Sequence, residues 1–149
     1  MGRIPVRVEL DKRDIDLDTV RCPNCDGDIE TVGHIILNCP LAKDLWSRVV
    51  RWWNGGAIQY SGLDDMFIGK SSGSNSNVSK LWQAIEWVCG YVLWKNRNLK
   101  VFEKKVCSVP MAFNEIQSKS FLWISSRAKN LQLDWNSWLL QPNVFDNHG

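Results

Sequence analysis

The sequence predicts a mainly α-helical protein, in which a small Cys- and His-containing module near the N-terminus precedes a bundle of about three to four helices. Three observations support this fold class. Apolar residues recur at helical spacing in several segments after residue 40. No alternation of apolar and polar residues persists for the length of a strand, and no internal repeat is found. Three of the five Cys and one of the two His crowd into residues 22–39.

Length and composition set limits on what the chain can be. Its 149 residues suit one domain of ordinary size, and its apolar fraction of 44% and charged fraction of 23% are typical of globular proteins. A complete polymerase, a kinase or a (β/α)₈ barrel of about 250 residues does not fit this length. Nine Trp against two Tyr is the one unusual feature, and the formal net charge of +2 does not by itself indicate a nucleic-acid or membrane partner.

The first elements lie on either side of the Cys/His cluster. Residues 7–15 are compatible with a short helix. Pro40 to Trp53 has an amphipathic pattern, because apolar residues recur there at spacings of three and four. We expect Asn38 to cap this helix, Pro40 to lie in its first turn, and the sequence Asn-Gly-Gly at 54–56 to end it.

A long helix is expected from Ser79 to about Lys105, after a flexible linker at residues 54–78 that contains the low-complexity sequence SSGSNSN. Gly90 falls in the middle of this helix, where Gly costs roughly 1 kcal/mol relative to Ala. Close packing of another helix would explain its presence. The linker and the long helix differ in composition, so we place a boundary between them at residue 79.

The C-terminal third predicts one more long helix and a short apolar cluster. Ser108 and Pro110 open the helix, which ends near Asn130, and the cluster at Trp135, Trp138 and Leu139 precedes the tail. The resulting domain organisation is a zinc-binding module with its following helix (1–53), a flexible linker (54–78), a helical region (79–141) and a disordered tail (142–149).

The Cys/His cluster has the spacing C-x₂-C-x₈-H-x₄-C, formed by Cys22, Cys25, His34 and Cys39. Thiolate and imidazole are the donors that Zn²⁺ prefers, and four of them complete a tetrahedral site with no place for a water nucleophile. Gly27 would let the backbone turn away from the ion. The pattern therefore predicts one structural zinc ion in a CCHC module. Four buried residues without a metal are the less favoured alternative.

The remaining Cys and His are not expected to be functional. Cys89 lies on the apolar face of the long predicted helix and is interpreted as a core residue. Cys107 lies between helices without a nearby His, and His148 is in the tail. The start of the chain has no apolar run typical of a signal peptide, and the apolar stretch 81–93 is too short to span a bilayer. We therefore expect an intracellular protein, in the nucleus or the cytoplasm, without a membrane partner.

Residues 7–53 strongly resemble the zinc-binding domain found after the reverse transcriptase in plant non-LTR (LINE-type) retroelements. The shared features are a charged stretch, CPxC, an acidic linker, His followed by an apolar run and Cys, and a helix that ends in paired Trp. Residues 93–102, LWKNRNLKVF, look like the W-K-x-R-N-x-x-V-F element that follows this domain. The resemblance implies a zinc module in a retroelement polyprotein, with the reverse transcriptase as its neighbour, that helps to handle nucleic acid.

The resemblance does not imply polymerase activity, since the catalytic domain of the family lies upstream. Leu63-Asp64-Asp65 superficially resembles the paired aspartates of a polymerase. A polymerase needs such carboxylates in a hairpin with a third one, to hold two Mg²⁺ about 3.5–4 Å apart. Here the pair lies in a predicted loop, and a turn or helix cap explains it better. We expect a protein that is not an enzyme and that has no catalytic residues.

A nucleic-acid interface is predicted at the end of the long helix. Residues 79–105 contain six basic and two acidic residues, whereas residues 1–53 contain eight basic and nine acidic ones. The candidate contacts to RNA or DNA are Lys95, Arg97, Lys100 and Lys104, which would bind phosphates without sequence specificity. The alternative is a solvated helix end whose cations complement the helix dipole.

Two classes of function remain open from the sequence. In the first, the zinc module contacts RNA or DNA beside a reverse transcriptase. In the second, zinc only stabilises the fold, and the Trp-rich helices of a protein-interaction domain dock on a neighbour. Bases could stack on exposed Trp side chains. However, we expect at least seven of the nine Trp to be structural, because most of them fall at the spacing of a helical core.

Overall fold

A computed structural model of the chain describes residues 20–54, 77–128 and 131–142. Within these ranges the protein is mainly helical, which confirms the predicted fold class. A single π-helical turn, η1 (His34–Asn38), is followed by the α-helices α2 (Pro40–Trp53), α4 (Asn77–Glu103), α5 (Val109–Arg127) and α6 (Trp135–Leu140). The only β-type pairing among these residues is an isolated antiparallel bridge between Arg21 and Ile29.

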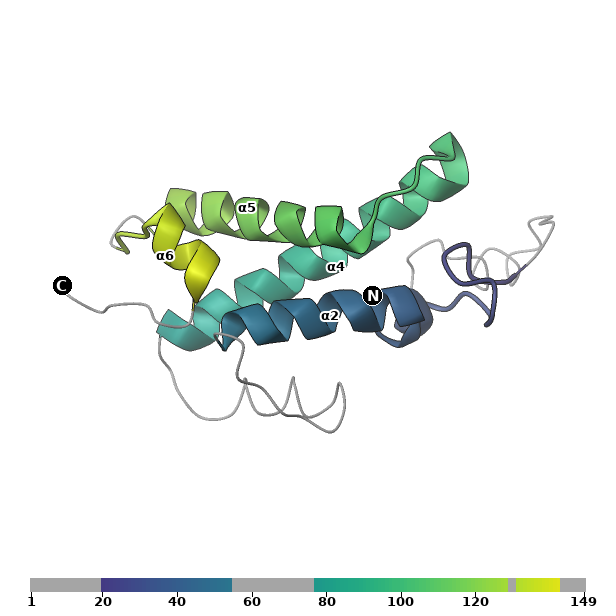
Figure 1. The fold of residues 1–149 in the computed structure, drawn as a ribbon, viewed down its shortest axis with the longest axis horizontal. Coiled ribbons are helices and arrows are strands. Elements are labelled where there is room, and N and C mark those ends of the chain that lie inside the picture. The colour runs from purple at the N-terminus through teal and green to yellow at the C-terminus, as the bar shows by residue number, and fades with distance from the viewer. Residues whose placement is uncertain (1–19, 55–76, 129–130, 143–149) are drawn as a thin grey trace.

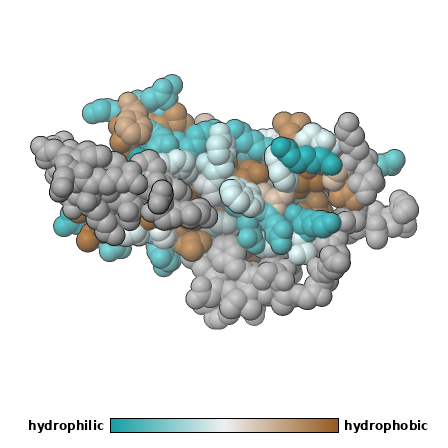
Figure 2. Space-filling view, turned by 180° about the vertical axis from the view of Figure 1, so that it is seen from behind, coloured by the Kyte–Doolittle hydropathy of each residue, from teal (hydrophilic) through white to brown (hydrophobic). Residues whose placement is uncertain are grey.

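The helices form a bundle in which α2 and α5 run along the long axis and α4 crosses them obliquely (Figure 1). One hydrophobic core connects them, since buried side chains of α2, α4, α5 and α6 belong to the same cluster as Cys22 and Cys39. Brown hydrophobic side chains nevertheless interrupt the hydrophilic surface in several places (Figure 2). No helix in the described part of the chain is long and apolar enough to cross a membrane.

The ends of α2 and α5 follow from their sequences. The helix α2 has the predicted bounds, with Pro40 in its first turn, but its N-cap is Cys39. The prediction that Asn38 is the cap was wrong, because Asn38 is the last residue of the π-helical turn. In α5 the predicted cap Ser108 accepts a hydrogen bond from the backbone N–H of Met111 at 3.3 Å.

The long helix α4 begins and ends two residues earlier than predicted. It ends because Lys104 has a left-handed φ of 55°, after which the N–H of Lys105 donates to the carbonyl of Leu99 at 3.1 Å. The explanation offered for Gly90 was wrong, since a Cβ atom there would meet no other atom within 4 Å. Among the described residues, no helix approaches α4 closely at Gly90.

Tryptophan side chains connect the bundle. The indole N–H of Trp52 in α2 donates to the carbonyl of Trp138 in α6 at 2.8 Å, and the indole of Trp138 donates to the carbonyl of Gln117 in α5 at 3.1 Å. Edge-on ring contacts add to these bonds. Seven of the nine Trp pack against other side chains, as predicted: Trp46, Trp52, Trp53, Trp82, Trp94, Trp135 and Trp138.

Several sequence predictions fall outside the described residues. They concern the short helix at residues 7–15, the Leu63-Asp64-Asp65 sequence, most of the linker, and His148. The division of the chain into four segments also stays a prediction.

Candidate metal centre

The first two predicted ligands lie in a short turn held by backbone hydrogen bonds. The N–H of Cys22 donates to the carbonyl of Asp28 at 2.7 Å, and the N–H of Asp26 donates to the carbonyl of Cys22 at 2.8 Å. The turn needs one left-handed residue, and that residue is Asp26, with φ 55°. The expectation that Gly27 supplies the backbone freedom was therefore wrong. Asp tolerates this conformation better than most residues with a Cβ atom.

The other two predicted ligands flank the π-helical turn η1. The N–H of Cys39 donates to the carbonyl of His34 at 2.7 Å, a bond between residues five apart that is characteristic of this geometry. At the start of the turn, the N–H of His34 donates to Oγ1 of Thr31 at 3.0 Å. The turn therefore fixes His34 and Cys39 relative to one another.

The four ligand atoms converge. The three Sγ atoms and a ring nitrogen of His34 all lie within 4.8 Å of one another. The Sγ atoms of Cys22 and Cys39 are 3.9 Å apart, and Nε2 of His34 is 3.2 Å from Sγ of Cys25. Tetrahedral zinc with Zn–S bonds of about 2.3 Å requires sulfur atoms about 3.8 Å apart. The cluster therefore fits a zinc ion bound by three Cys and by Nε2 of His34.

Hydrogen bonds and burial act in opposite directions on the pKa values of the ligand thiols. The backbone N–H groups of Asn24 and Gly27 point at Sγ of Cys22 and Cys25, each at 3.4 Å. At Cys25, burial opposes ionisation, but the Gly27 N–H and His34 outweigh it and lower the pKa to about 7. Burial raises the pKa of Cys22 to about 12 and also raises the pKa of Cys39. A bound cation would reverse these two shifts, because a coordinated thiol is deprotonated.

The chemistry of this donor set is structural. Three sulfur atoms and one nitrogen complete the coordination of a single zinc ion, which leaves no position for a reacting water. Cys22 and Cys39 are fully buried and belong to the hydrophobic core. A zinc ion bound here would hold the start of α2 against the turn that precedes it.

Comparison with known proteins agrees with this geometry. Residues 1–46 match the family model described as zinc-binding in reverse transcriptase. Over this N-terminal segment the chain is similar to that zinc-binding family. The match confirms the resemblance to a zinc-binding domain of reverse transcriptases, and the donor set fits the predicted single structural zinc ion. No curated protein matches the chain, and no solved structure matches it. The family that matches is a zinc-binding one and not a catalytic one.

A buried ion pair attaches the zinc-binding segment to α4. Arg97 donates from Nε and Nη2 to the two carboxylate oxygens of Glu30, at 2.9 and 2.7 Å. Both side chains are buried, with 2% and 0% of their area exposed. Arg97 also lies over the ring of Trp94, 5.0 Å from its centre. The prediction that Arg97 contacts nucleic acid is therefore wrong, because its guanidinium faces the zinc loop and is shielded from solvent.

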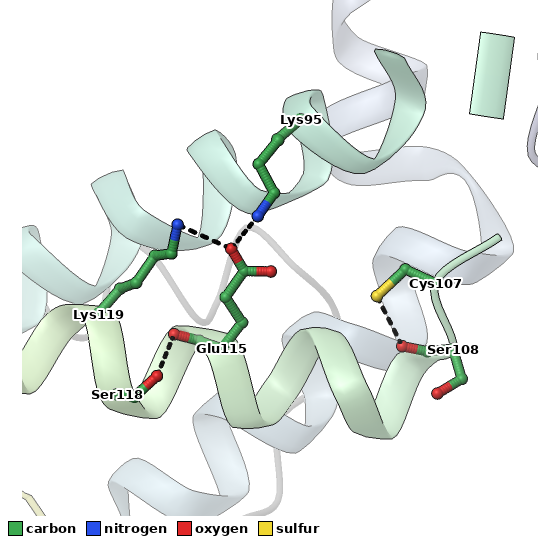
Figure 3. A network of polar contacts seen from close by, with 6 residues as sticks. All are labelled: Lys95, Cys107, Ser108, Glu115, Ser118 and Lys119. Carbon is green, nitrogen blue, oxygen red and sulfur yellow. Dashed lines mark hydrogen bonds and ion pairs between the residues drawn. The ribbon is translucent and has the colours of Figure 1, made fainter. Parts of the chain in front are cut away.

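The other predicted nucleic-acid contacts are closer to solvent. Lys95 forms an ion pair with Glu115 of α5, which also pairs with Lys119 at 2.9 Å (Figure 3). Lys100 is half-buried and Lys104 is exposed, at the end of α4. The structure thus does not place the four residues on one exposed stripe. Of the four, only Lys100 and Lys104 remain candidates for phosphate contacts that would not compete with the ion pairs to Glu30 and Glu115.

The sequence analysis missed Glu30 and assigned Arg97 to a different role from the one that the structure shows. Glu30 lies inside the metal loop and was not singled out, and its carboxylate accepts from Arg97 of α4. Arg97 follows Leu93 by four residues and continues the buried face of α4, and this spacing could have indicated its burial. Cys89 is fully buried, as predicted, and Cys107 is half-buried beside the carbonyl of Ser108.

Proposed function

We propose that this chain is a non-catalytic module of reverse transcriptase origin that assists nucleic-acid binding. The zinc ion fixes the loop, and the loop in turn fixes the basic end of α4. The observation that supports this proposal is the Glu30–Arg97 pair, which joins the metal loop to the last turns of α4. The cations of that helix end, Lys100, Lys104 and Lys105, are thereby held in a defined place beside the zinc-binding segment.

The chemistry of these cations suits phosphate contacts without base recognition. They extend from the C-terminal end of a helix and carry flexible side chains, which act as point charges toward a phosphate backbone. Each contact that neutralises a phosphate releases counterions, so the affinity falls steeply with salt. The partner is RNA or DNA, and in the parent polyprotein the reverse transcriptase domain lies beside the module.

The test is a salt titration of binding to labelled single-stranded and duplex oligonucleotides, followed by fluorescence anisotropy. We expect the K100Q/K104Q variant to lose affinity at low salt. The slope of log K against log salt should become shallower by about 1.4 for a single strand, since two contacts are removed at about 0.7 each. The matched control is K43Q/R51Q, which removes two exposed cations of α2 and should leave the slope unchanged.

A flat salt titration of the native zinc-loaded chain would overturn this proposal. That result is the one expected if the chain is instead a protein-docking domain stabilised by zinc. Equal losses of affinity in the two double variants would show a non-specific effect of net charge. That result would also overturn the assignment of the binding site to the end of α4.

A further inference from the structure

A groove between α4 and α5 lies outside the zinc-binding segment. The groove is open to solvent and has a volume of about 560 Å³, a size within the range of ligand-binding clefts. The side chains that dominate its wall come from both helices: Trp87, Tyr91, Lys119, Leu122, Trp123 and Arg127. The groove is formed by helices distant in sequence from the metal ligands, and the family match does not reach it.

The aromatic rings of this groove are unusual in their exposure. Trp87 is 74% exposed, Tyr91 is 54% exposed and Trp123 is 44% exposed. Six of the other seven Trp are buried or half-buried, and Trp135, which is 38% exposed, packs on the ring of Phe121. Trp87 and Tyr91 are four residues apart, so they lie one above the other on the same side of α4. Large flat apolar rings left open in a cleft indicate a ligand with flat apolar parts.

The charges of the groove have one sign. Lys119 and Arg127 line it, and among the described residues no carboxylate lines it. The ammonium of Lys119 is 5.2 Å from the ring centre of Tyr91, and the guanidinium of Arg127 is 4.4 Å from that of Trp123. Glu115 approaches Lys119 from outside the groove, but this one carboxylate is shared with Lys95 (Figure 3). The groove therefore complements an anion.

We propose that this groove binds the unpaired bases of a single-stranded nucleic acid, with Trp87 and Trp123 as stacking platforms and with Lys119 and Arg127 near the phosphates. A single strand combines flat π-faces with a regular series of negative charges, which is the chemistry that the groove complements. An apolar protein helix would cover the rings but would offer no negative charge to Arg127, and none to Lys119 beyond the Glu115 carboxylate that it shares with Lys95. The proposal rests on the proposed function, and it adds a preference for single strands.

The experiment compares a labelled oligothymidylate with a duplex of the same length, each titrated with the zinc-loaded full chain at constant salt. We expect the W87A/W123A variant to bind the single strand at least about tenfold more weakly, because each base stacked on an aromatic ring contributes substantially to affinity. Binding to the duplex should change less than twofold. The milder variant W87F retains a ring and should recover most of the affinity, and circular dichroism establishes that each variant is folded.

The control is F102A, which removes a ring that is also 74% exposed but lies outside the groove, at the end of α4. It should bind the single strand as the native chain does. Unchanged single-strand binding by W87A/W123A would overturn the groove assignment while leaving salt-dependent binding, and hence the proposed function, in place. Absence of binding to either probe by the native chain would overturn both. A native chain that self-associates through Trp87 and Trp123 on a sizing column would assign the groove to a protein contact instead.

Discussion

The zinc loop, residues 20–39, and the helical bundle are held together by different forces. The loop is stabilised mainly by backbone hydrogen bonds, by the four convergent ligand atoms and by the buried carboxylate of Glu30. Few apolar side chains are buried in it. In the bundle, large apolar side chains pack, and indole hydrogen bonds connect α2, α6 and α5. The loop thus depends on a metal ion, whereas the bundle depends on the burial of apolar surface.

The two regions are in direct contact, and this limits how independent they are. The indole N–H of Trp46 in α2 donates to the carbonyl of Ile36 in the loop at 2.6 Å. The ligands Cys22 and Cys39 belong to the same buried cluster as the bundle side chains. The Glu30–Arg97 pair adds a polar contact between residues 67 apart in sequence. A metal site of few residues can therefore position one end of a much larger helical structure.

The largest expected effect is the loss of zinc. Replacing Cys39 by Ser removes one ligand, and structural zinc contributes an apparent ~10–16 kcal/mol to folding in small zinc modules. We expect amide exchange in residues 20–39 to become fast, while most of the helical circular dichroism signal of the bundle persists. Cobalt substitution of the native chain should give the absorption spectrum of three sulfur ligands and one nitrogen.

The control for this prediction is Cys107→Ser, which changes a half-buried thiol that lies outside the cluster. It should leave the cobalt spectrum and the exchange rates as they are. Complete unfolding of the bundle on treatment with a chelator would contradict the distinction between the two regions.

A second prediction concerns the bundle alone. Replacing Trp52 by Ala removes a buried ring, two edge-on ring contacts and the hydrogen bond to the carbonyl of Trp138. A loss of about 3–5 kcal/mol in the free energy of unfolding is expected, as for other buried aromatic residues. Urea denaturation measures it, with Trp87→Ala as the exposed control. Zinc affinity of the folded variant should not fall; a marked fall would mean that the bundle also shapes the metal site.

A third prediction tests the junction between the regions. Replacing Arg97 by Met leaves the carboxylate of Glu30 buried without this partner, which costs about 3–5 kcal/mol when a buried pair is broken. The double variant R97M/E30L should recover most of that loss, since apolar residues can replace a buried ion pair. Urea denaturation of the two single variants and the double variant gives the coupling energy. Additive losses would show that the pair does not couple the loop to α4.

The smallest expected effect concerns the pH dependence of stability. It separates the contribution of the bundle from that of the zinc-binding thiols. Burial raises the pKa of Glu86 in α4 from 4.5 to about 7, so the folded state favours its protonated form. The native chain therefore loses stability as the pH rises from about 5 to about 7, and the loss then levels off. Glu86→Gln should be more stable than the native chain by about 1–2 kcal/mol at pH 8, after a discount for the solvent-exposed part of the side chain.

Thermal denaturation of Glu86→Gln and the native chain across this pH range measures the difference between them, in which the contribution of the zinc thiolates cancels. A constant difference at all pH values would show that the Glu86 carboxyl group titrates normally in the folded protein.

Local features of the sequence were enough to predict much of the fold. The bounds of α2 follow from its strong apolar stripe and from Pro40, and Ser108 marks the start of α5. The predicted end of α4 differs from the observed one because the helix ends at the left-handed backbone of Lys104. Lys is a residue type with no preference for that conformation. The ligand spacing indicated which side chains could gather around zinc.

The interactions that join distant segments could not be predicted in the same way. Arg97 and Glu30 are 67 residues apart, and no local pattern states that they pair. A run of cations at a helix end predicts an exposed surface, but burial of Arg97 depends on the loop that folds over it. The exposure of Trp87 and Trp123 likewise depends on the packing of α4 against α5, because the same helical spacing is found in buried Trp.

The π-helical turn has a consequence for which insertions and deletions the metal site tolerates. Removing one residue between His34 and Cys39 would shorten the five-residue hydrogen-bonded turn to the α-helical form and rotate the imidazole by about 100° around the helix axis. By contrast, the stretch between Cys25 and His34 includes the exposed residues 26–29, where an added residue could bulge outward. Insertions and deletions in related chains should therefore accumulate between Cys25 and His34 and be absent between His34 and Cys39.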